Sequence, residues 1–260
     1  MSIEPTLDQR VNATQRPGGS PVMHQSWDKM LFMHWKVPVK VLRPLIPEPL
    51  EIDTFEGDAW IAFAPFTLTN VRPVYVPPVP LLSSFHETNV RTYVHLDGVP
   101  GVWFFSLDAN SAMTVWGARL FYFLPYFYSQ IRLTDNEGTI DYRLKRTAEM
   151  KAKFHAKWSI HDDEPFNAIP GSLEFFLAER YCLYTEHRGE IYRCRIHHQP
   201  WPLRRATLHE YSSDLFTADG LPEPKGDPLL HAAGPVDVEV WLLENVSKTQ
   251  PINEPATAAA

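Results

Sequence analysis

Polar and apolar residues alternate along residues 85–95, and this alternation predicts a β-strand with two different faces. The face that includes Val90 and Val94 suits packing against a core. The opposite face places a carboxylate, an amide, a guanidinium and a phenol in one row. These side chains belong to Glu87, Asn89, Arg91 and Tyr93. If this row faces the protein interior, we expect Glu87 and Arg91 to be largely buried and paired, because buried charges need partners.

Strand patterns recur along the chain, separated by turn residues at intervals of about 8–12 positions. The predicted extended segments are 27–37, 50–53, 59–68, 85–95, 102–107, 127–133, 139–146, 151–160, 180–186 and 190–197, with 204–216 and 236–246 as strands or strand edges. The predicted helices are short, at 111–121 and 173–178, with a helical turn at 39–45. This pattern predicts a mainly β (α+β) fold, most simply one antiparallel barrel or sandwich with a few short peripheral helices.

One domain is expected over residues 23–247, because no linker separates two cores. Residues 1–22 are polar and contain Pro-Gly-Gly-Ser, so we expect a flexible N-terminal segment. Residues 248–260 are expected to form a flexible C-terminal tail. Residues 71–80 contain too many prolines for a central strand, and we expect a loop that could form a rim or lid.

Composition mainly excludes classes of partner. The formal net charge of −7 gives no basic surface for nucleic acid. No run approaches the roughly 18 apolar residues that span a membrane. Residues 1–21 also lack the apolar core of a secretory signal. We therefore expect a cytoplasmic protein without nucleic-acid or membrane partners, and a homo-oligomer is left open.

Motifs for metals and cofactors are missing from the sequence. His-x-x-x-His and Cys-x-x-Cys do not occur, so no metal site is predicted. A Gly-x-Ser-x-Gly elbow, a phosphate loop and a dinucleotide glycine pattern are also missing, so no cofactor is predicted. Cys182 and Cys194 flank a predicted hairpin turn at 187–190. A two- or four-residue loop would leave the thiols out of register, whereas a three-residue loop could place them opposite each other. We favour small buried hydrophobes over a disulfide.

The row on residues 85–95 is the sharpest candidate site. Arg91, or Arg119 near the end of a predicted helix, could hold a ligand carboxylate through two hydrogen bonds. Glu87 could then move a proton. The alternative, weighed about equally, is that this face meets solvent or that its charges form a structural network.

Two other groups of residues are given structural interpretations. A desolvated lysine can act as a nucleophile, but Lys151, Lys153 and Lys157 share one strand face and are interpreted as a solvated stripe. Polar groups among aromatic residues, at Arg180-Tyr181 and at 198–202, are predicted to pack in the core rather than to line a pocket.

Several longer stretches resemble the YqjF-like family, also described as domain of unknown function 2071. They are WDKMLFMHW, LEIDTFEGDAWIAFAPF, FHETNVRTYV, GVPGVWFFSLDA, ARLFYFLPY, LAERYCLYT and HHQPWPL, and the resemblance covers roughly residues 25–245. That family is grouped with the acetoacetate decarboxylase-like superfamily. The resemblance implies a cone-like antiparallel β-barrel around a central cavity, with short helices packed outside, and it loosely implies Glu87 as a pocket glutamate.

The sequence departs from the acetoacetate decarboxylases at the residue that carries their chemistry. Those enzymes hold a Schiff-base lysine in a Lys pair that follows Gly-Arg-Glu and Trp-Gly-aromatic-Pro. Setting Gly117 on the first glycine puts Pro125 and Tyr126 at the lysine pair. If Trp116-Gly117 is aligned with the Trp-Gly of the motif instead, Leu120 and Phe121 fall at the positions of the lysine pair. Neither alignment supplies an amine, so the cavity is implied without Schiff-base decarboxylation.

These observations give one expected function and two alternatives. We expect a small organic acid or polar metabolite to bind in a central cavity. The candidate ligand-binding residues are Arg91, Arg119, Asn89, Tyr93 and Tyr126. The first alternative is a lyase or hydratase acting on a keto or enol acid, with Glu87 as general base. The second is a structural or interaction module without a ligand, which a cavity filled by apolar side chains would favour. Whether the protein is an enzyme is left open.

Overall fold

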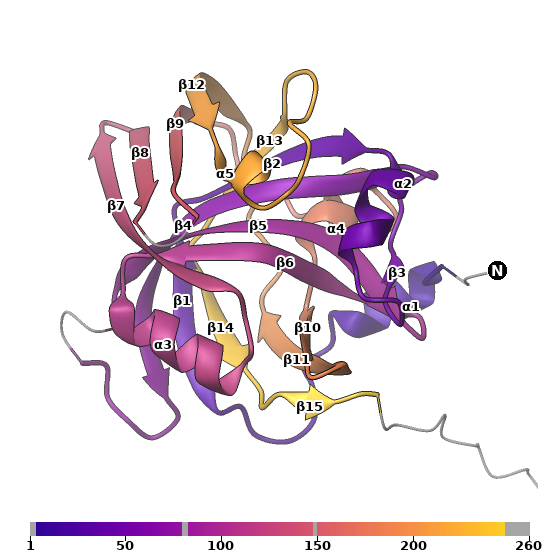
Figure 1. The fold of residues 1–260 in the computed structure, drawn as a ribbon. Coiled ribbons are helices and arrows are strands. Elements are labelled where there is room, and N and C mark those ends of the chain that lie inside the picture. Colours follow the sequence, from indigo (N-terminus) through magenta and orange to yellow (C-terminus); the bar gives the residue numbers. More distant parts are fainter. Residues whose placement is uncertain (1–3, 80–82, 148–149, 248–260) are drawn as a thin grey trace, which may run out of the picture.

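The computed structural model describes residues 4–79, 83–147 and 150–247. The helices are α1 (Leu7–Ala13), α2 (Val39–Leu42), the 3-10 helix η1 (Arg43–Leu45), α3 (Ala112–Phe121), α4 (Leu173–Ala178) and α5 (Leu215–Ala218). The strands are β1 (Met23–Asp28), β2 (Met30–Val37), β3 (Glu51–Ile52), β4 (Ala59–Pro73), β5 (Phe85–Leu96), β6 (Val99–Ala109), β7 (Tyr126–Asn136), β8 (Thr139–Arg146), β9 (Ala152–Ile160), β10 (Cys182–His187), β11 (Glu190–His198), β12 (Ala206–Ser213), β13 (Leu229–Ala233), β14 (Val236–Val240) and β15 (Glu244–Asn245). The chain is mainly β, with a few short helices on its outside (Figure 1).

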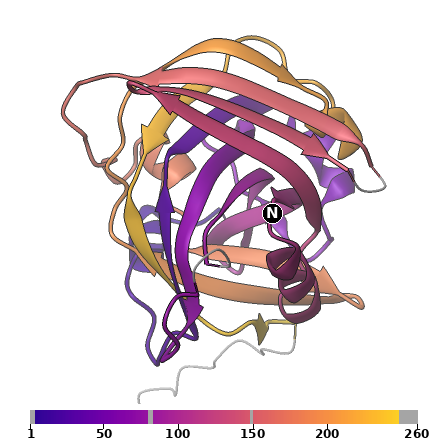
Figure 2. The same ribbon diagram turned by 90° about the vertical axis from the view of Figure 1, so that its left-hand side faces the viewer.

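Part of the sheet closes on itself as a ring (Figure 2). The ring runs through β4, β5, β6, β10, β11, β14 and β1, and β1 pairs with β4 again. β6 pairs in parallel with β10 and β7, whereas the other strand pairs of the described residues are antiparallel. Gly101 permits β10 to approach β6, because a Cβ there would lie 2.7 Å from the Tyr184 ring. The predicted fold class is confirmed, and the two parallel pairs refine its antiparallel description.

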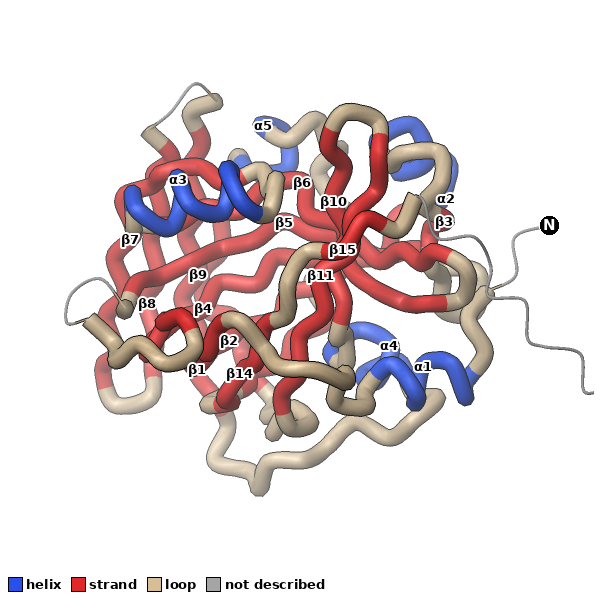
Figure 3. The backbone as a smooth tube through the Cα atoms, turned by 90° about the horizontal axis from the view of Figure 1, so that it is seen from below, coloured by secondary structure: helices blue, strands red, loops and turns tan. Residues whose placement is uncertain are grey.

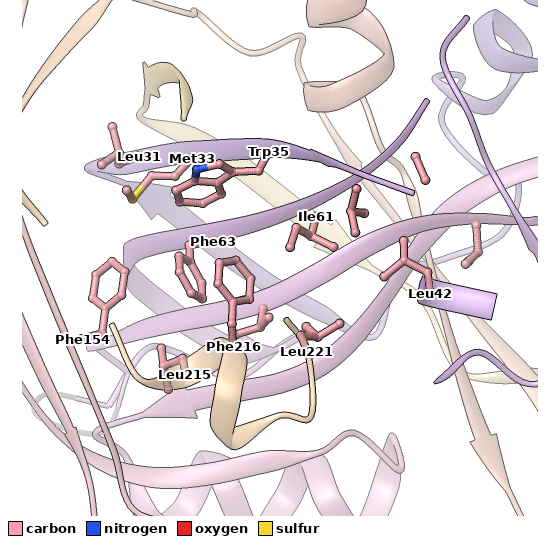
Figure 4. Close-up of a cluster of buried hydrophobic side chains, with 14 of the residues drawn as sticks. Leu31, Met33, Trp35, Leu42, Ile61, Phe63, Phe154, Leu215, Phe216 and Leu221 are labelled. Atoms are coloured by element: carbon pink, nitrogen blue, oxygen red, sulfur yellow. The ribbon is translucent and has the colours of Figure 1, made fainter. Parts of the chain in front are cut away.

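Strands β4, β5 and β6 form a wall between the ring interior and a packed core. β2 and β13 continue the sheet from β4, while β7, β8, β9 and β12 continue it from β6. The core on this side contains Phe63 and Val90 from the wall, and α5 inserts Phe216. The rings of Phe63 and Phe216 stack with their centroids 4.0 Å apart (Figure 4). Since side chains alternate along a strand, the apolar face of β5 meets this core and its polar face meets the ring interior.

Two helices lie at different sides of the ring. Ser111 is the N-cap of α3, and its hydroxyl accepts a hydrogen bond from the backbone N–H of Thr114. Ser172 caps α4 in the same way. The views of Figures 1 and 3 agree that α3 and α4 lie toward opposite sides of the molecule. Among the described residues, no helix has the length and apolar character needed to cross a bilayer.

The hairpin of β10 and β11 explains the state of the two cysteines. Both residues of the turn Arg188-Gly189 have positive φ, at 55° and 78°, which is typical of a two-residue type I′ turn. This loop pairs Cys182 with Arg195, so Cys182 and Cys194 are out of register. Both thiols are free and buried, and burial raises the pKa of Cys182 to about 12. The preference for buried thiols over a disulfide is confirmed.

The N-terminal segment contains an element that the sequence analysis did not predict. α1 begins with a capping box in which Thr6 and Gln9 exchange side-chain and backbone hydrogen bonds. β4 also continues to Pro73, into the segment that was expected to be a loop, and β13 and α5 were not predicted. Flexibility of residues 1–22 and a single domain over 23–247 stay predictions. Residues 248–260 lie outside the described part of the chain.

Candidate functional site

The polar face of β5 lines a cavity of about 300 Å³ inside the ring. Glu87, Asn89 and Arg91 expose only 3 %, 5 % and 8 % of their surfaces. As predicted, they share one face and are buried. Two of the three have small neighbours on β4, since Asn89 pairs with Ala64 and Arg91 pairs with Ala62, whereas Glu87 pairs with Phe66. These alanines leave space beside the sheet at the places where the longer polar side chains project.

Glu87 is paired with a tyrosine rather than with Arg91. The Tyr126 hydroxyl donates a hydrogen bond of 2.8 Å to Glu87 Oε2, and Tyr126 also lines the cavity. Burial raises the pKa of Glu87 to about 8, and the nearby charge of Asp108 adds to the rise, although the Tyr126 hydrogen bond opposes it. The Glu87 carboxyl is therefore protonated and uncharged at neutral pH. The expected pairing of Glu87 with Arg91 is wrong.

Two guanidinium groups meet at the Tyr93 ring. The guanidinium carbons of Arg91 and Arg180 lie 5.7 Å and 4.9 Å from its centroid. The C-terminal carbonyls of α4 hold all three side chains. Leu177 O accepts from Tyr93 Oη at 3.0 Å and from Arg91 Nη2 at 3.4 Å, and Phe176 O accepts from Arg180 Nε at 2.7 Å. Carbonyls at a helix end lack helical partners, so they are suited to bind cations.

Carboxylates are scarce around these guanidinium groups. Asp53 is fully buried and accepts hydrogen bonds from Arg180 at 2.6 Å and from Arg10 of α1 at 2.6 and 2.7 Å. Burial by itself would raise the pKa of Asp53, but the two guanidinium groups outweigh burial and hold that pKa below its ordinary value. Arg91 forms no ion pair within the described ranges. Positive charge therefore exceeds negative charge at this end of the cavity.

Several buried polar atoms of the cavity lining lack a protein partner among the described residues. They are Arg91 Nε, Arg180 Nη2, Asn89 Oδ1 and His198 Nε2. His198 Nδ1 lies 2.7 Å from the carbonyl oxygen of Gln199, and a carbonyl can only accept, so Nδ1 carries the proton. Burial lowers the pKa of His198 to about 4. The ring is neutral near pH 7, and its Nε2 offers a lone pair to a donor.

The rest of the cavity is mainly apolar and opens beside α3. Trp27 and Trp201 stack at 6.1 Å near the polar end, and His198 lies 4.9 Å from Trp201. Toward α3 the lining contains Phe85 and Phe121. Phe121 is 63 % exposed, so it lies where the cavity meets the surface. The cavity has a cationic end near α4 and an apolar end near α3.

The buried arginine Arg146, which lies outside the cavity, provides a contrast with Arg91. Arg146 of β8 binds both oxygens of Asp108 at 2.6 and 2.8 Å and Asp219 at 2.9 Å, and it donates to Ser106 as well. All of these partners are protein groups, and Arg146 does not line the cavity. Arg146 is thus a satisfied structural ion pair, whereas the guanidinium of Arg91 keeps hydrogen-bonding capacity toward the cavity.

The structure does not bring Arg119 to the cavity. It is exposed on α3, where Nε donates to the Tyr126 carbonyl at 2.6 Å and the guanidinium carbon lies 5.6 Å from the Phe127 ring centroid. Tyr93 is fully buried behind the two arginines rather than among the lining residues. Of the predicted ligand-binding residues, Asn89, Arg91 and Tyr126 line the cavity.

Sequence reasoning gave Arg180 and His198 a packing role, and both line the cavity. The available signal was a polar residue set among aromatic residues at a strand end, which also describes a core site. Among the described residues, no lysine lines the cavity. Phe121 and Tyr126, each aligned with one position of the lysine pair in one of the two alignments, line it instead. Within the described part of the chain, no group of three or more His, Cys, Asp and Glu side chains is arranged to hold a metal ion.

The sequence of the chain matches a known protein family. Residues 24–237 match the family DUF2071, described as an uncharacterized conserved protein. The chain is 45 % identical over 231 residues to the uncharacterized protein YqjF of Bacillus subtilis (strain 168), a match that covers 89 % of this chain and 95 % of YqjF.

Solved structures with a similar fold have low sequence identity. Acetoacetate decarboxylase of Legionella pneumophila matches with a TM-score of 0.60 and 12 % identity, over 95 % of this chain and 97 % of that one. The enduracididine biosynthesis enzyme MppR, in a complex with pyruvate, matches with a TM-score of 0.60 and 13 % identity, over 87 % of this chain and 91 % of MppR. These two matches establish an acetoacetate decarboxylase-like fold. The family match and the identity to YqjF show that the chain belongs to the DUF2071 family.

Proposed function

We propose that this protein binds a small organic acid inside the ring, with the ligand carboxylate on the guanidinium groups of Arg91 and Arg180. The observation that carries the proposal is the Arg91 side chain, which is 8 % exposed and forms no ion pair among the described residues. A buried charge without a partner is unfavourable. A carboxylate matches the planar fork of a guanidinium group and would supply the missing partner.

The other polar groups of the cavity are compatible with an anion. Burial raises the pKa of Glu87 to about 8, so the carboxyl is mostly uncharged at neutral pH and repels a ligand carboxylate little. The oxygen of the Asn89 side chain has no partner among the described residues, and turning the amide over would present its NH2 group to the ligand. Asp53, the carboxylate nearest to the arginines, is already bound by Arg10 and Arg180.

The fold relatives support this class of ligand. One MppR structure is described as a complex with pyruvate, which is a small carboxylic acid. That protein shares 13 % identity with this chain, so the ligand class here depends on the chain's own arginines rather than on the relative.

The test is calorimetric titration of the protein with pyruvate, acetoacetate and hexanoate, each compared with an uncharged amide. We expect the acids to bind and the amides to bind more weakly. In Arg91→Met, loss of a hydrogen bond to a charged group should cost about 1.5–3 kcal/mol, or roughly 10- to 100-fold in Kd. Arg143→Met is the matched control, because Arg143 is exposed on β8 and pairs with Asp141.

Two outcomes would contradict the proposal. One is equal affinity for an acid and its amide in the parent protein. The other is unchanged acid affinity in Arg91→Met when circular dichroism shows that the variant is folded.

A second candidate function is a lyase or hydratase acting on a keto or enol acid. The pKa of Glu87, raised by burial to about 8, favours it because a group that titrates near neutral pH is suited to proton transfer. The carboxyl would begin as a general acid rather than as the expected general base, since it is protonated at pH 7. We expect Glu87→Gln to bind acids but to lose roughly 100- to 10,000-fold in turnover of 2-hydroxy or enol acids, followed by NMR. Turnover that persists in Glu87→Gln would exclude this role.

A further inference from the structure

The apolar end of the cavity limits which acids fit the site. Phe85, Glu87, Asn89 and Arg91 all line the cavity from one face of β5. A strand rises about 3.3 Å per residue, so these six residue steps span roughly 20 Å. The cavity is therefore elongated along β5, with Arg91 at one end and Phe85 at the other.

The volume is larger than a two- or three-carbon acid requires. A water molecule takes up about 30 Å³ in the liquid, so 300 Å³ corresponds to about ten water-sized groups. A carboxylate uses three non-hydrogen atoms, and the remaining space accepts a tail. The groups beside that space are apolar, including Leu68 and Leu124.

Glu87 places little negative charge in the part of the cavity between Arg91 and Phe85 at neutral pH. Its carboxyl lies between the arginines and the apolar end, and Tyr126 already satisfies Oε2. Because burial raises the pKa of Glu87 to about 8, the group is neutral at pH 7. An alkyl chain can lie beside a neutral, hydrogen-bonded carboxyl at much less cost than beside a carboxylate.

The mouth is apolar as well. Phe121 both lines the cavity and is 63 % exposed, and its ring lies edge-on to Trp116, which is 66 % exposed, at 6.3 Å. Leu120 on the same helix is 50 % exposed. Exposed apolar groups gathered at a cavity mouth are typical of sites that receive apolar ligands.

We infer that the ligand is an amphipathic monocarboxylic acid whose head binds Arg91 and Arg180 and whose apolar tail extends toward α3. Rigid aromatic tails and unbranched alkyl tails share this chemistry, and about ten groups, two of them carboxylate oxygens, correspond to roughly eight carbons in total. The inference depends on the proposed function, because the carboxylate site is the same.

The test is the affinity of the parent protein for straight-chain acids from propanoate to dodecanoate, measured by calorimetry below the critical micelle concentration. Each buried methylene should tighten binding roughly fourfold until the cavity is filled, after which the affinity should level off. Octanamide is the uncharged comparison for octanoate. Phenylpropanoate and phenylbutanoate test aromatic tails.

Two alanine-to-phenylalanine variants on α3 test where the apolar tail of the ligand lies. Ala118 of α3 lines the cavity, whereas Ala112 at the start of the helix is exposed and does not. Ala118→Phe should weaken decanoate binding at least tenfold and leave propanoate unchanged, and Ala112→Phe should change neither. The thermal midpoint of each variant reports whether it is folded.

The outcomes separate the two proposals. If short acids bind and added methylenes do not tighten binding, the apolar-tail inference is overturned and the carboxylate site stands. If octanoate and octanamide bind equally, the carboxylate site is overturned and the ligand is not an acid. If no acid of any length binds, both are overturned. The expected result is a rising series with a plateau that Ala118→Phe shifts to shorter chains.

Discussion

The Tyr126 hydroxyl donates a 2.8 Å hydrogen bond to Glu87 Oε2 in the interior of the ring. Tyr126 stands at one of the positions aligned with the lysine pair of the acetoacetate decarboxylases. In that alignment a phenol, hydrogen-bonded to the Glu87 carboxyl, stands where a Schiff-base enzyme needs an amine. The pair is uncharged at neutral pH, because burial raises the pKa of the carboxyl to about 8 and the pKa of the phenol above its ordinary value.

Glu87 should make the folded protein less stable as the pH rises. Its pKa is raised from about 4.5 to about 8, so the folded state binds this proton more tightly than the unfolded state. Between these pH values the free energy of unfolding should fall by at most about 1.4 kcal/mol per pH unit from this group. Glu87→Gln removes the titration, so the variant should gain stability over the parent as pH rises from 5 to 8. Urea unfolding at pH 5, 6.5 and 8 measures this difference.

The control for this prediction is Glu48→Gln, which changes an exposed glutamate. Other buried groups also titrate in this range, so only the difference between parent and variant is informative. A difference between Glu87→Gln and the parent that stays constant from pH 5 to pH 8 would show that Glu87 has an ordinary pKa.

Arg91 and Arg146 are both buried, but their replacement should have different effects on stability. Removing Arg146 leaves Asp108 and Asp219 buried without their cation, so Arg146→Met should destabilise by about 3–5 kcal/mol. Arg91→Met leaves no buried carboxylate without its cation, and the Leu177 carbonyl keeps its hydrogen bond from Tyr93. We expect a change within about 1 kcal/mol. Equal, large losses in both variants would mean that Arg91 is a structural residue.

The N-terminal helix α1 should contribute to stability through one side chain. Arg10 forms two of the three hydrogen bonds that Asp53 receives from arginines. Arg10→Met should destabilise by about 1.5–3 kcal/mol, since Asp53 keeps Arg180. Asp53→Asn should cost more, because both guanidinium groups lose their carboxylate. Chemical unfolding of the two variants gives the order, and an unchanged Arg10→Met would show that α1 does not stay docked in solution.

The alternation of side chains on β5 was sufficient to predict that the polar residues share one face, because strand periodicity fixes which residues lie together, but it left open whether that face meets the interior or solvent. The sequence pattern could not identify what lies on each side of that face. The ring depends on contacts between strands far apart in the chain, such as β1 with β14 and β4. For the same reason, the sequence did not show that Tyr126 of β7 is the hydrogen-bond partner of Glu87. Nor did it show that Arg180 supplies the second guanidinium group of the cavity.

Arg119 and Arg180 show the limit of reasoning from residue type. Both are arginines among aromatic residues near an element's end, and the sequence analysis favoured Arg119 for the pocket. The direction of α3 places Arg119 outside the cavity, and the turn after α4 points Arg180 inward. Residue type indicates what a side chain can bind, but the packing of its element decides what it reaches.

The last prediction concerns covalent chemistry. A Schiff-base lysine needs a neutral amine near pH 7, which takes burial or a nearby cation, because a free lysine titrates near about 10.4. No lysine of the described residues is buried, and none lines the cavity. We expect no adduct after incubation with acetoacetate and borohydride, and no release of carbon dioxide. Intact-mass spectrometry checks the first expectation. A stoichiometric mass gain on one lysine would overturn the alignment argument and make Schiff-base decarboxylation the leading mechanism.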